Sequence, residues 1–406
     1  MISLIPTSLA RRLLIARLKH LADGELLLQD TDGTLHTFGR RTARCELSIR
    51  IVITDARFYG STLRGGTVGA GEAYMQGWWR CDDLTGLIRL MVVNQAVMGS
   101  LERGFAWLSR PTRALLHRLN RNSRAGSRRN IAAHYDLGND FYQLMLDETL
   151  AYSCGIFETP TSSLADASRA KFDAICQALQ LKADERLLEI GTGWGGLAIH
   201  AAQHYGCHVT TTTVSQRQYE YVRARIAELG LADRITLLLK DYRDLDGEYD
   251  KIVSVEMIEA VGANFLDTYF AQCSRLLKNS GAMLLQAITI RDQLYERALQ
   301  SVDFIQRHIF PGSFIPSITA MSQSLLRATD LKIARLNDIG PHYARTLAEW
   351  RRNVMDKLDR VRALGYPDSF IRMWEFYLCY CEGGFAERQL GDVQMLLIKP
   401  EYPSGV

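Results

Sequence analysis

The chain has 406 residues, more than one average domain, which predicts two or three compact units. Hydrophobic residues make up 47% of it, which excludes a disordered chain and supplies sizeable cores. The formal net charge of +3 hides an asymmetry, because residues 1–130 hold 20 Lys and Arg against 10 Asp and Glu, whereas the remainder holds 28 against 35. No secretory leader and no bilayer-spanning apolar run is visible, so any membrane contact is expected to be peripheral.

The amino-terminal third predicts a small α+β domain over residues 1–108. Residues 9–21 place leucines on one helical face, typical of a helix that packs on its own domain or lies in a membrane interface. Residues 26–85 have short apolar runs separated by glycines, which indicates strands. We interpret this domain as one for lipid docking or self-association.

Residues 109–129 predict a basic connector, since they hold seven arginines and no acid. Such a segment is either a solvated linker or a surface for anionic lipid or nucleic acid. No aromatic residue lies between the arginines, which argues against a nucleic-acid strand as the partner.

From residue 130 onward the sequence alternates between strand and helix patterns. Helical spacing occurs at 197–205 and 218–229, and buried strands are predicted at 187–190, 208–214, 235–239, 251–255 and 281–290. This rhythm predicts an α/β fold with a doubly wound, mostly parallel sheet. Ligands should bind at the carboxyl ends of its strands.

The glycine-rich turn after the first of these strands carries the strongest chemical signal. Glu189 is followed by Gly191, Gly193 and Gly195, and glycines allow positive φ and close approach of backbone N–H groups to a ligand. The Glu189 carboxylate favours S-adenosylmethionine, which is positively charged, over a dinucleotide, whose pyrophosphate it would repel. An NAD-binding loop or an ordinary strand–helix connection remains the alternative.

Polar residues also follow the other strands. Thr213 and Gln218 follow the second, where a dinucleotide enzyme usually has an acid for the ribose, and Asp241 with Tyr242 and residues 256–259 follow the next two. The eight cysteines show neither metal-ligand nor disulfide spacing, so no metal site is predicted and a reducing cytoplasm is the simplest location.

Residues 133–142, which read Ala-His-Tyr-Asp-Leu-Gly-Asn-Asp-Phe-Tyr, and residues 151–155 resemble the cyclopropane fatty acid synthase family, which includes the mycolic acid cyclopropane synthases. The resemblance covers about residues 40–395 and continues through 189–196, 213–218, 241–244, 257–262, 310–312, Tyr343 and 377–384. It implies a class I methyltransferase domain over residues 130–406, in which helices inserted between 291 and 390 cap an acyl pocket.

The resemblance implies transfer of a methyl(ene) group from S-adenosylmethionine to the cis double bond of an unsaturated phospholipid acyl chain, giving a cyclopropane, with a bicarbonate ion as base. Besides Glu189 and Gly195, it assigns the cofactor to Tyr152, Ser153, Gly191, Gly193, Thr213, Val214, Gln218, Asp241 and Tyr242. It assigns the bicarbonate to the backbones of Cys154 and Ile288 and to Glu259 and Tyr343.

One position departs from the family, because Gln286 stands where the ring-forming members carry a histidine. A glutamine amide can still bind bicarbonate but cannot relay a proton. Methyl transfer is therefore expected to survive, while loss of a proton elsewhere on the chain would give a methylene- or methyl-branched product, or a furan precursor, as the alternative to a ring.

Aromatic side chains are expected to stabilise the carbocation that methyl transfer leaves on the acyl chain, or to line the acyl pocket. Ordinary packing is the alternative for each. The carbocation candidates are Tyr152, Phe157, Tyr269 and Tyr343, and the pocket candidates are Phe304, Ile305, Phe310, Phe314, Met373, Trp374 and Phe376. The partners expected are unsaturated phospholipid, an anionic membrane at the inner face of the cytoplasmic membrane and a second copy of the chain, but not nucleic acid. A non-catalytic lipid-binding protein and a methyltransferase for RNA or a small molecule are the remaining alternatives.

Overall fold

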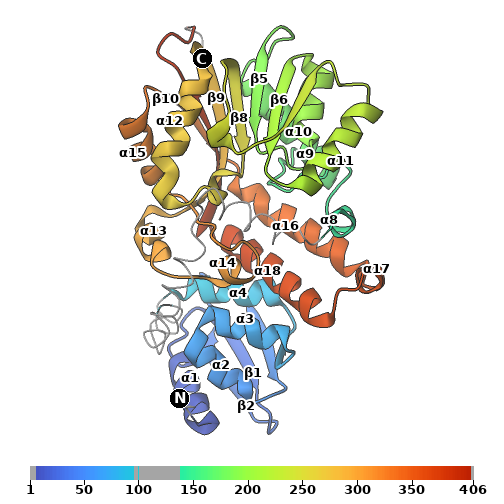
Figure 1. Cartoon of the computed structure of the whole chain (residues 1–406). Helices are drawn as coiled ribbons and strands as arrows, with labels where there is room; N and C mark the ends of the chain where they lie inside the picture. Colours follow the sequence, from blue (N-terminus) through green and yellow to red (C-terminus); the bar gives the residue numbers. More distant parts are fainter. Residues whose placement is uncertain (1–5, 96–98, 100–137, 404–406) are drawn as a thin grey trace. The chain divides into compact units, whose positions relative to one another are not determined.

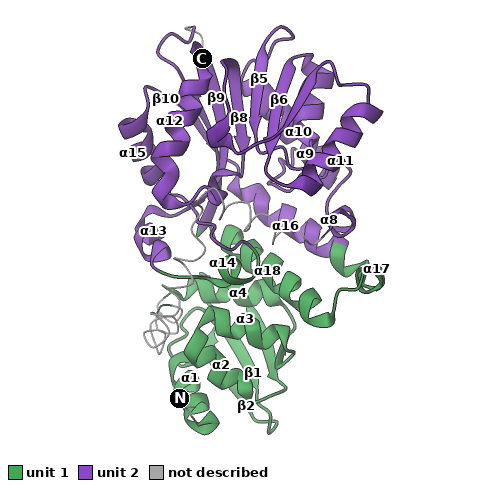
Figure 2. Ribbon diagram, viewed as in Figure 1, with its two compact units in different colours: residues 1–119, 301–309, 354–389 green, residues 120–300, 310–353, 390–406 purple. Residues whose placement is uncertain are grey.

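The structure is a computed structural model that describes residues 6–95, 99 and 138–403. The predicted basic connector and the start of the 133–142 motif lie outside the described residues. The chain divides into two compact units (Figures 1 and 2). Unit 1 comprises residues 1–119, 301–309 and 354–389, and unit 2 comprises the rest.

Unit 1 contains the predicted amino-terminal α+β structure. Its sheet has the order β2-β1-β3-β4, in which β1 pairs antiparallel with β2 and parallel with β3. The elements are α1 (Thr7–Leu18), β1 (Gly24–Gln29), β2 (Leu35–Arg40), β3 (Ser48–Ile53), α2 (Arg57–Gly65), α3 (Thr67–Met75), β4 (Trp79–Cys81) and α4 (Leu84–Val93). Helix α1 buries Ala10, Leu14 and Leu18, so the apolar face of residues 9–21 packs on its own unit.

Unit 1 also contains segments that the sequence assigned to the methyltransferase domain: α14 (Phe304–His308), α17 (Leu358–Ala363) and α18 (Asp368–Ala386). Helix α18 packs on α3 and α4, where the hydroxyl of Tyr74 donates to Glu375 at 2.8 Å. Helices inserted between residues 291 and 390 were expected from the resemblance, but the unit on which α18 packs was not. The predicted continuous domain over residues 130–406 therefore differs from the observed division.

Three of the predicted pocket residues, Phe304, Trp374 and Phe376, are buried in unit 1. The rings of Phe304 and Phe376 are 4.6 Å apart, and a Cβ added to Gly71 would lie 2.6 Å from the Phe304 ring. This close contact favours the packing interpretation for Phe304.

Phe304→Ala is expected to lower the free energy of unfolding by about 3–5 kcal/mol, because it removes a fully buried ring from a close-packed cluster. The folded variant is expected to keep its acyl-chain preference. Urea unfolding and product analysis check this, with Leu364→Ala, an exposed leucine of the same unit, as the control. A changed chain preference at nearly unchanged stability would restore the pocket interpretation.

Unit 2 has a seven-stranded sheet of order β10-β11-β9-β8-β5-β6-β7. Strands β5 to β9 are parallel, and β11 and β10 add an antiparallel edge, which confirms the predicted doubly wound, mostly parallel sheet. The strands are β5 (Arg186–Ile190), β6 (His208–Thr213), β7 (Ile235–Leu239), β8 (Tyr249–Val255), β9 (Leu277–Ile290), β10 (Lys332–Asp338) and β11 (Leu390–Ile398). The strand order reverses at β5, the place where such sheets bind ligands.

Helices cover both faces of this sheet (Figure 1), with α12 and α15 on one face and α9, α10 and α11 on the other. Leu188 and Leu187 of β5 point into the two separate cores, as alternation along a strand requires. The helices are α8 (Asn139–Met145), α9 (Leu164–Ala178), α10 (Gly196–His200), α11 (Gln216–Glu228), α12 (Leu266–Leu276), α13 (Asp292–Leu299), α15 (Ile318–Ala328) and α16 (Gly340–Met355). The part of α16 up to residue 353 belongs to unit 2, and its last two residues belong to unit 1. Among the described residues of both units, no helix has the length and apolarity to span a membrane.

Candidate functional site

The glycine turn leaves β5 directly after Ile190. Gly191, Gly193 and Gly195 all have positive φ, of 99°, 52° and 86°, which explains why this turn needs glycine. A Cβ added to Gly193 would meet no atom within 4 Å, so the turn borders open space. The buried Oγ1 of Thr192 in the same turn has no hydrogen-bond partner among the described residues.

Glu189 is a buried acid of β5 whose Oε2 accepts a hydrogen bond from Thr211 of β6. Burial raises the pKa of Glu189 to about 8, so the side chain is largely protonated at neutral pH. A bound cation would favour its ionised form.

The burial of Glu189 has a consequence for stability. Its pKa in the folded state lies above the ordinary value of 4.5, so between the two pH values the folded state binds more protons than the unfolded state. The free energy of unfolding should fall as the pH rises from 4.5 towards 8, by up to about 1.4 kcal/mol per pH unit. Glu189→Gln is expected to remove this contribution, as urea unfolding of the ligand-free protein across that range will show. An equally steep pH dependence in the variant would contradict the assignment.

The ends of β6 and β7 supply the other predicted cofactor groups. The hydroxyl of Thr213 donates to Gln218 Oε1 at 2.7 Å, while the buried Nε2 of Gln218 has no partner among the described residues. Asp241 accepts two hydrogen bonds from the Arg243 guanidinium, at 2.8 and 2.7 Å, and Tyr242 packs on Tyr269. The unpartnered Nε2 of Gln218 and the open space at Gly193 fit a cofactor rich in hydrogen-bonding groups. The individual cofactor contacts stay predictions.

The groups predicted to hold bicarbonate are already bonded to a glutamate. Cys154 N and Gln286 Nε2 donate to Glu256 Oε1, at 2.9 and 2.8 Å, and the hydroxyl of Tyr343 donates to Glu256 Oε2 at 2.6 Å. The backbone N–H of Ile288 donates to Glu259 Oε1 at 2.7 Å. The residues present therefore do not fit a separate bicarbonate ion, because a carboxylate of the chain takes its donors. The donors of Cys154, Gln286 and Tyr343 contact Glu256 in place of an ion, and the catalytic roles of these residues and of Glu259 and Ile288 stay predictions.

Glu256 itself received no role in the sequence analysis, which noted it only as part of the strand end at 256–259. It lies directly after β8 with a φ of 48°, in the left-handed region that is costly for a residue with a side chain. Its backbone N–H donates to Gln286 O at 2.9 Å. Strained non-glycine residues persist where the surroundings hold them, often at functional sites, so the conformation agrees with a functional carboxylate. Two features of the sequence could have indicated a role for Glu256: this extra acid directly after the strand, and the departure from the family at Gln286.

Gln286 connects Glu256 to a second buried acid. Its Nε2 also donates to Asp392 Oδ2 at 3.1 Å, and its Oε1 accepts from Gln394 Nε2 at 3.1 Å. Burial and the neighbouring Glu256 raise the pKa of Asp392 well above its ordinary value, which favours the protonated form of Asp392. The amide hydrogens of Gln286 thus join the carboxyl groups of Glu256 and Asp392.

Two other groups of the cluster are also neutral. Burial first and Glu256 second raise the pKa of Glu259 to about 8, and its buried Oε2 has no partner among the described residues. Burial also raises the pKa of the Cys154 thiol, so Cys154 contributes through its backbone and not as a thiolate.

Of the four carbocation candidates, two gather at one place. The rings of Tyr152 and Tyr343 lie 5.1 and 6.0 Å from the ring of Trp350, a residue that the sequence analysis missed. Tyr269 is fully buried in the core of unit 2, and the face of Phe157 is covered by the Arg345 guanidinium at 4.0 Å. Tyr152 and Tyr343 therefore remain as candidates.

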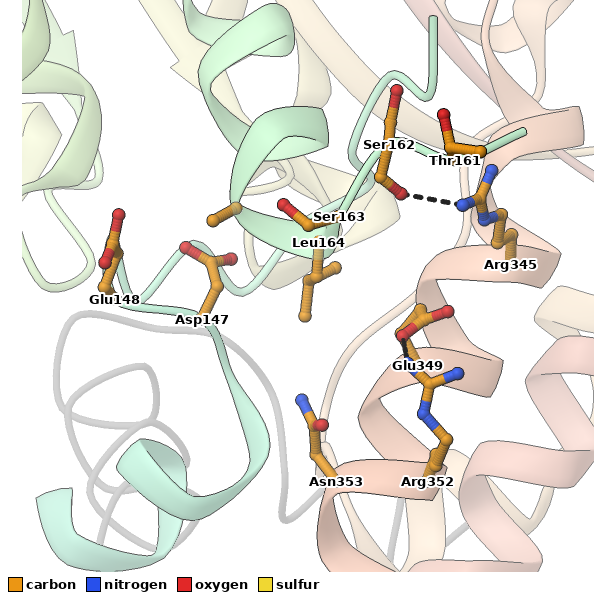
Figure 3. Close-up of a pocket in the computed structure, with 11 residues that line it drawn as sticks. Asp147, Glu148, Thr161, Ser162, Ser163, Leu164, Arg345, Glu349, Arg352 and Asn353 are labelled. Carbon is orange, nitrogen blue, oxygen red and sulfur yellow. Dashed lines mark hydrogen bonds and ion pairs between the residues drawn. The ribbon is translucent and has the colours of Figure 1, made fainter. Parts of the chain in front are cut away.

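A separate surface pocket of about 570 Å³ lies beside α16 (Figure 3). Charged and polar side chains make up most of its lining, and Arg345 donates to the carbonyl oxygen of Ser162 at 2.7 Å. None of the predicted site residues lines it, so the strand-end cluster is the candidate site.

Comparisons with known proteins agree with this geometry. A family model described as mycolic acid cyclopropane synthetase matches residues 122–395. The tuberculostearic acid methyltransferase of Mycobacterium tuberculosis is 40% identical over 84% of this chain and 81% of its own length. The cyclopropane-fatty-acyl-phospholipid synthase of Escherichia coli K12 is 35% identical over 85% and 86%. A solved mycolic acid cyclopropane synthase complexed with SAH and CTAB matches with a TM-score of 0.63 and 31% identity, over 67% of this chain and 98% of that one.

Proposed function

The chain belongs to the mycolic acid cyclopropane synthetase family, and on this premise we propose that it methylates the cis double bond of an unsaturated phospholipid acyl chain, with Glu256 as proton acceptor. Membership makes it a methyltransferase that uses S-adenosylmethionine to modify lipid acyl chains. The observation that carries the proposal is the convergence of Cys154 N, Gln286 Nε2 and the Tyr343 hydroxyl on the Glu256 carboxylate.

When bound, S-adenosylmethionine supplies an electrophilic methyl group. The alkene donates its electron pair to that methyl carbon while the carbon–sulfur bond breaks, which leaves a positive charge on the neighbouring chain carbon. An alkene is a weak nucleophile, so the site must align it, and alignment can supply about 7–11 kcal/mol in favourable cases. The rings of Tyr152 and Tyr343 supply aromatic faces that attract the cation.

Glu256 completes the reaction by accepting a proton from the cation. One carbon–hydrogen bond breaks, its electron pair neutralises the cation, and the carboxylate becomes a carboxylic acid. The neighbouring acids favour this assignment, because burial raises the pKa of Asp392 and of Glu259, which favours their protonated forms and makes them poorer proton acceptors. In this proposal the Glu256 carboxylate takes the place of the bicarbonate ion that the family resemblance implied as base.

The site favours a branched product. Gln286 has no titratable proton and cannot relay one, so removal of a proton from the new methyl group is expected to be slow. Slower proton removal gives a hydride time to move from the methylated carbon to the cationic one, which leaves the more stable tertiary cation. Loss of a methyl proton to Glu256 then yields a methylene branch, and the 40% identical relative is named a methyltransferase.

A cyclopropane product is the second candidate. It requires loss of the methyl proton before the hydride moves, so that the electron pair closes the ring. The identity to the Escherichia coli cyclopropane-fatty-acyl-phospholipid synthase, which extends over most of both chains, favours it. Esterified phospholipid as substrate, contact with an anionic membrane and homodimer formation stay predictions.

The test incubates purified protein with methyl-labelled S-adenosylmethionine and vesicles of dioleoyl phosphatidylglycerol, in carbon-dioxide-free buffer and with added bicarbonate. Label is expected in the acyl chains at equal rates in both buffers, and mass spectrometry of the methyl esters distinguishes branch from ring. Vesicles with saturated chains are the control. Absence of label would refute the function, and an absolute requirement for bicarbonate would refute the role of Glu256.

A further inference from the structure

Gln394 is a buried glutamine of β11, with 4% of its surface exposed. It lies directly across the sheet from Gln286 of β9, which is fully buried. The next pair on the same sheet face is Leu396 with Leu284, and both leucines belong to an apolar core of unit 2. A buried amide is costly unless its polar atoms are hydrogen-bonded, so the glutamine pair needs partners that a leucine pair would not.

The hydrogen bonds of the Gln286 amide determine which way it points. Its Nε2 donates to Glu256 Oε1 at 2.8 Å and to Asp392 Oδ2 at 3.1 Å. An amide oxygen in that place would face two oxygens to which it has no hydrogen to donate. The amide oxygen points instead to Gln394, whose Nε2 donates to it at 3.1 Å. A chain of hydrogen bonds with one direction therefore runs from Gln394 through Gln286 to Glu256.

We propose that Gln394 is a positioning residue of the methyl-transfer site: its amide donor fixes the orientation of Gln286, which in turn holds the Glu256 carboxylate in place as the proton acceptor. This inference rests on the proposed function of Glu256. It assigns a purpose to a polar pair at the end of two strands whose neighbouring pair on the same face is apolar.

Glu256 needs support of this kind, because its φ of 48° lies in the left-handed region, which is costly for a residue with a side chain. Gln286 supports it twice. Its backbone carbonyl oxygen accepts from the backbone N–H of Glu256 at 2.9 Å, and its side chain donates to the carboxylate. A change in the direction of the Gln286 amide therefore alters the contact that holds the carboxylate, while the backbone contact remains.

The experiment compares Gln394→Met, which has nearly the same length but no donor, with Gln286→Met and with the double variant. In Gln394→Met, kcat for labelled methyl transfer to vesicles of dioleoyl phosphatidylglycerol is expected to fall about tenfold, as for a lost hydrogen bond that aligns a catalytic group. The KM for lipid and the Kd for S-adenosylmethionine are expected to change by no more than about twofold, since the lost bond acts on the proton acceptor and not on binding.

The double variant separates positioning from packing. Because Gln394 acts through Gln286, Gln394→Met is expected to cause no further loss of kcat once Gln286 is methionine, whereas independent packing defects would multiply. Ser324→Ala is the control, since it removes a buried hydroxyl of α15 that donates to Asp267 outside the site. It is expected to lower the melting temperature without changing kcat.

Should the methionine variants fail to fold, the same comparison is made with leucine at both positions, which repeats the neighbouring leucine pair. An unchanged kcat in the folded Gln394 variant, or losses that multiply in the double variant, overturns the proposal. A wild-type protein that labels no lipid refutes the proposed function instead.

Discussion

Glu256→Gln is expected to lower the rate of methyl transfer to unsaturated lipid by about 1,000-fold, within the range of a lost general base. The amide has almost the same shape as the carboxylate and can still accept from Cys154 N or Tyr343, but it cannot take a proton from the cation. The affinity for S-adenosylmethionine is expected to change by no more than a few fold. Labelled methyl transfer and calorimetry measure the two quantities.

Glu259→Gln is the informative comparison for the Glu256→Gln variant. The pKa of Glu259, about 8, means that the side chain already carries a proton at neutral pH, so a neutral amide is a mild change there. We expect its rate to stay within about tenfold of wild type, well short of the loss of a general base. Equal losses in the two variants would show that the proton acceptor is not Glu256 alone.

Glu256→Gly combined with Gln286→His is expected to make methyl transfer depend on added bicarbonate and to shift the product towards the ring. Removal of the carboxylate frees the donors of Cys154 and Tyr343, and glycine suits the left-handed backbone at position 256. The introduced imidazole can titrate, which Gln286 cannot. Formate or acetate should serve as weaker substitutes for bicarbonate.

Gln286→His alone is expected to lower activity without changing the product. One imidazole nitrogen cannot donate to both Glu256 and Asp392, as the amide of Gln286 does, and Glu256 still fills the ion position. Mass spectrometry of the methyl esters with and without bicarbonate tests both variants. A double variant that is indifferent to bicarbonate would contradict the replacement of the ion by Glu256.

The sequence by itself determined strands β5 to β9, the glycine turn and the family, because these depend on local patterns, whereas the antiparallel edge strands β10 and β11 were not predicted. The alternation of residues 187–290 predicted the parallel sheet, and Gly191, Gly193 and Gly195 adopt the positive φ that glycine permits. Thr213 and Gln218 meet, as expected for residues at one strand end. Such features follow from backbone propensity and periodicity within a few residues.

Only the tertiary structure decided the occupant of the predicted ion site. Glu256 meets Cys154, Gln286 and Tyr343, which lie 102, 30 and 87 positions away in the chain, and no local pattern records a contact of that kind. The same holds for α18, which lies in the region where inserted helices were expected but whose packing on α3 and α4 places it in unit 1. Side-chain contacts between distant segments depend on how buried faces and charges pair, which becomes visible only once the chain has folded.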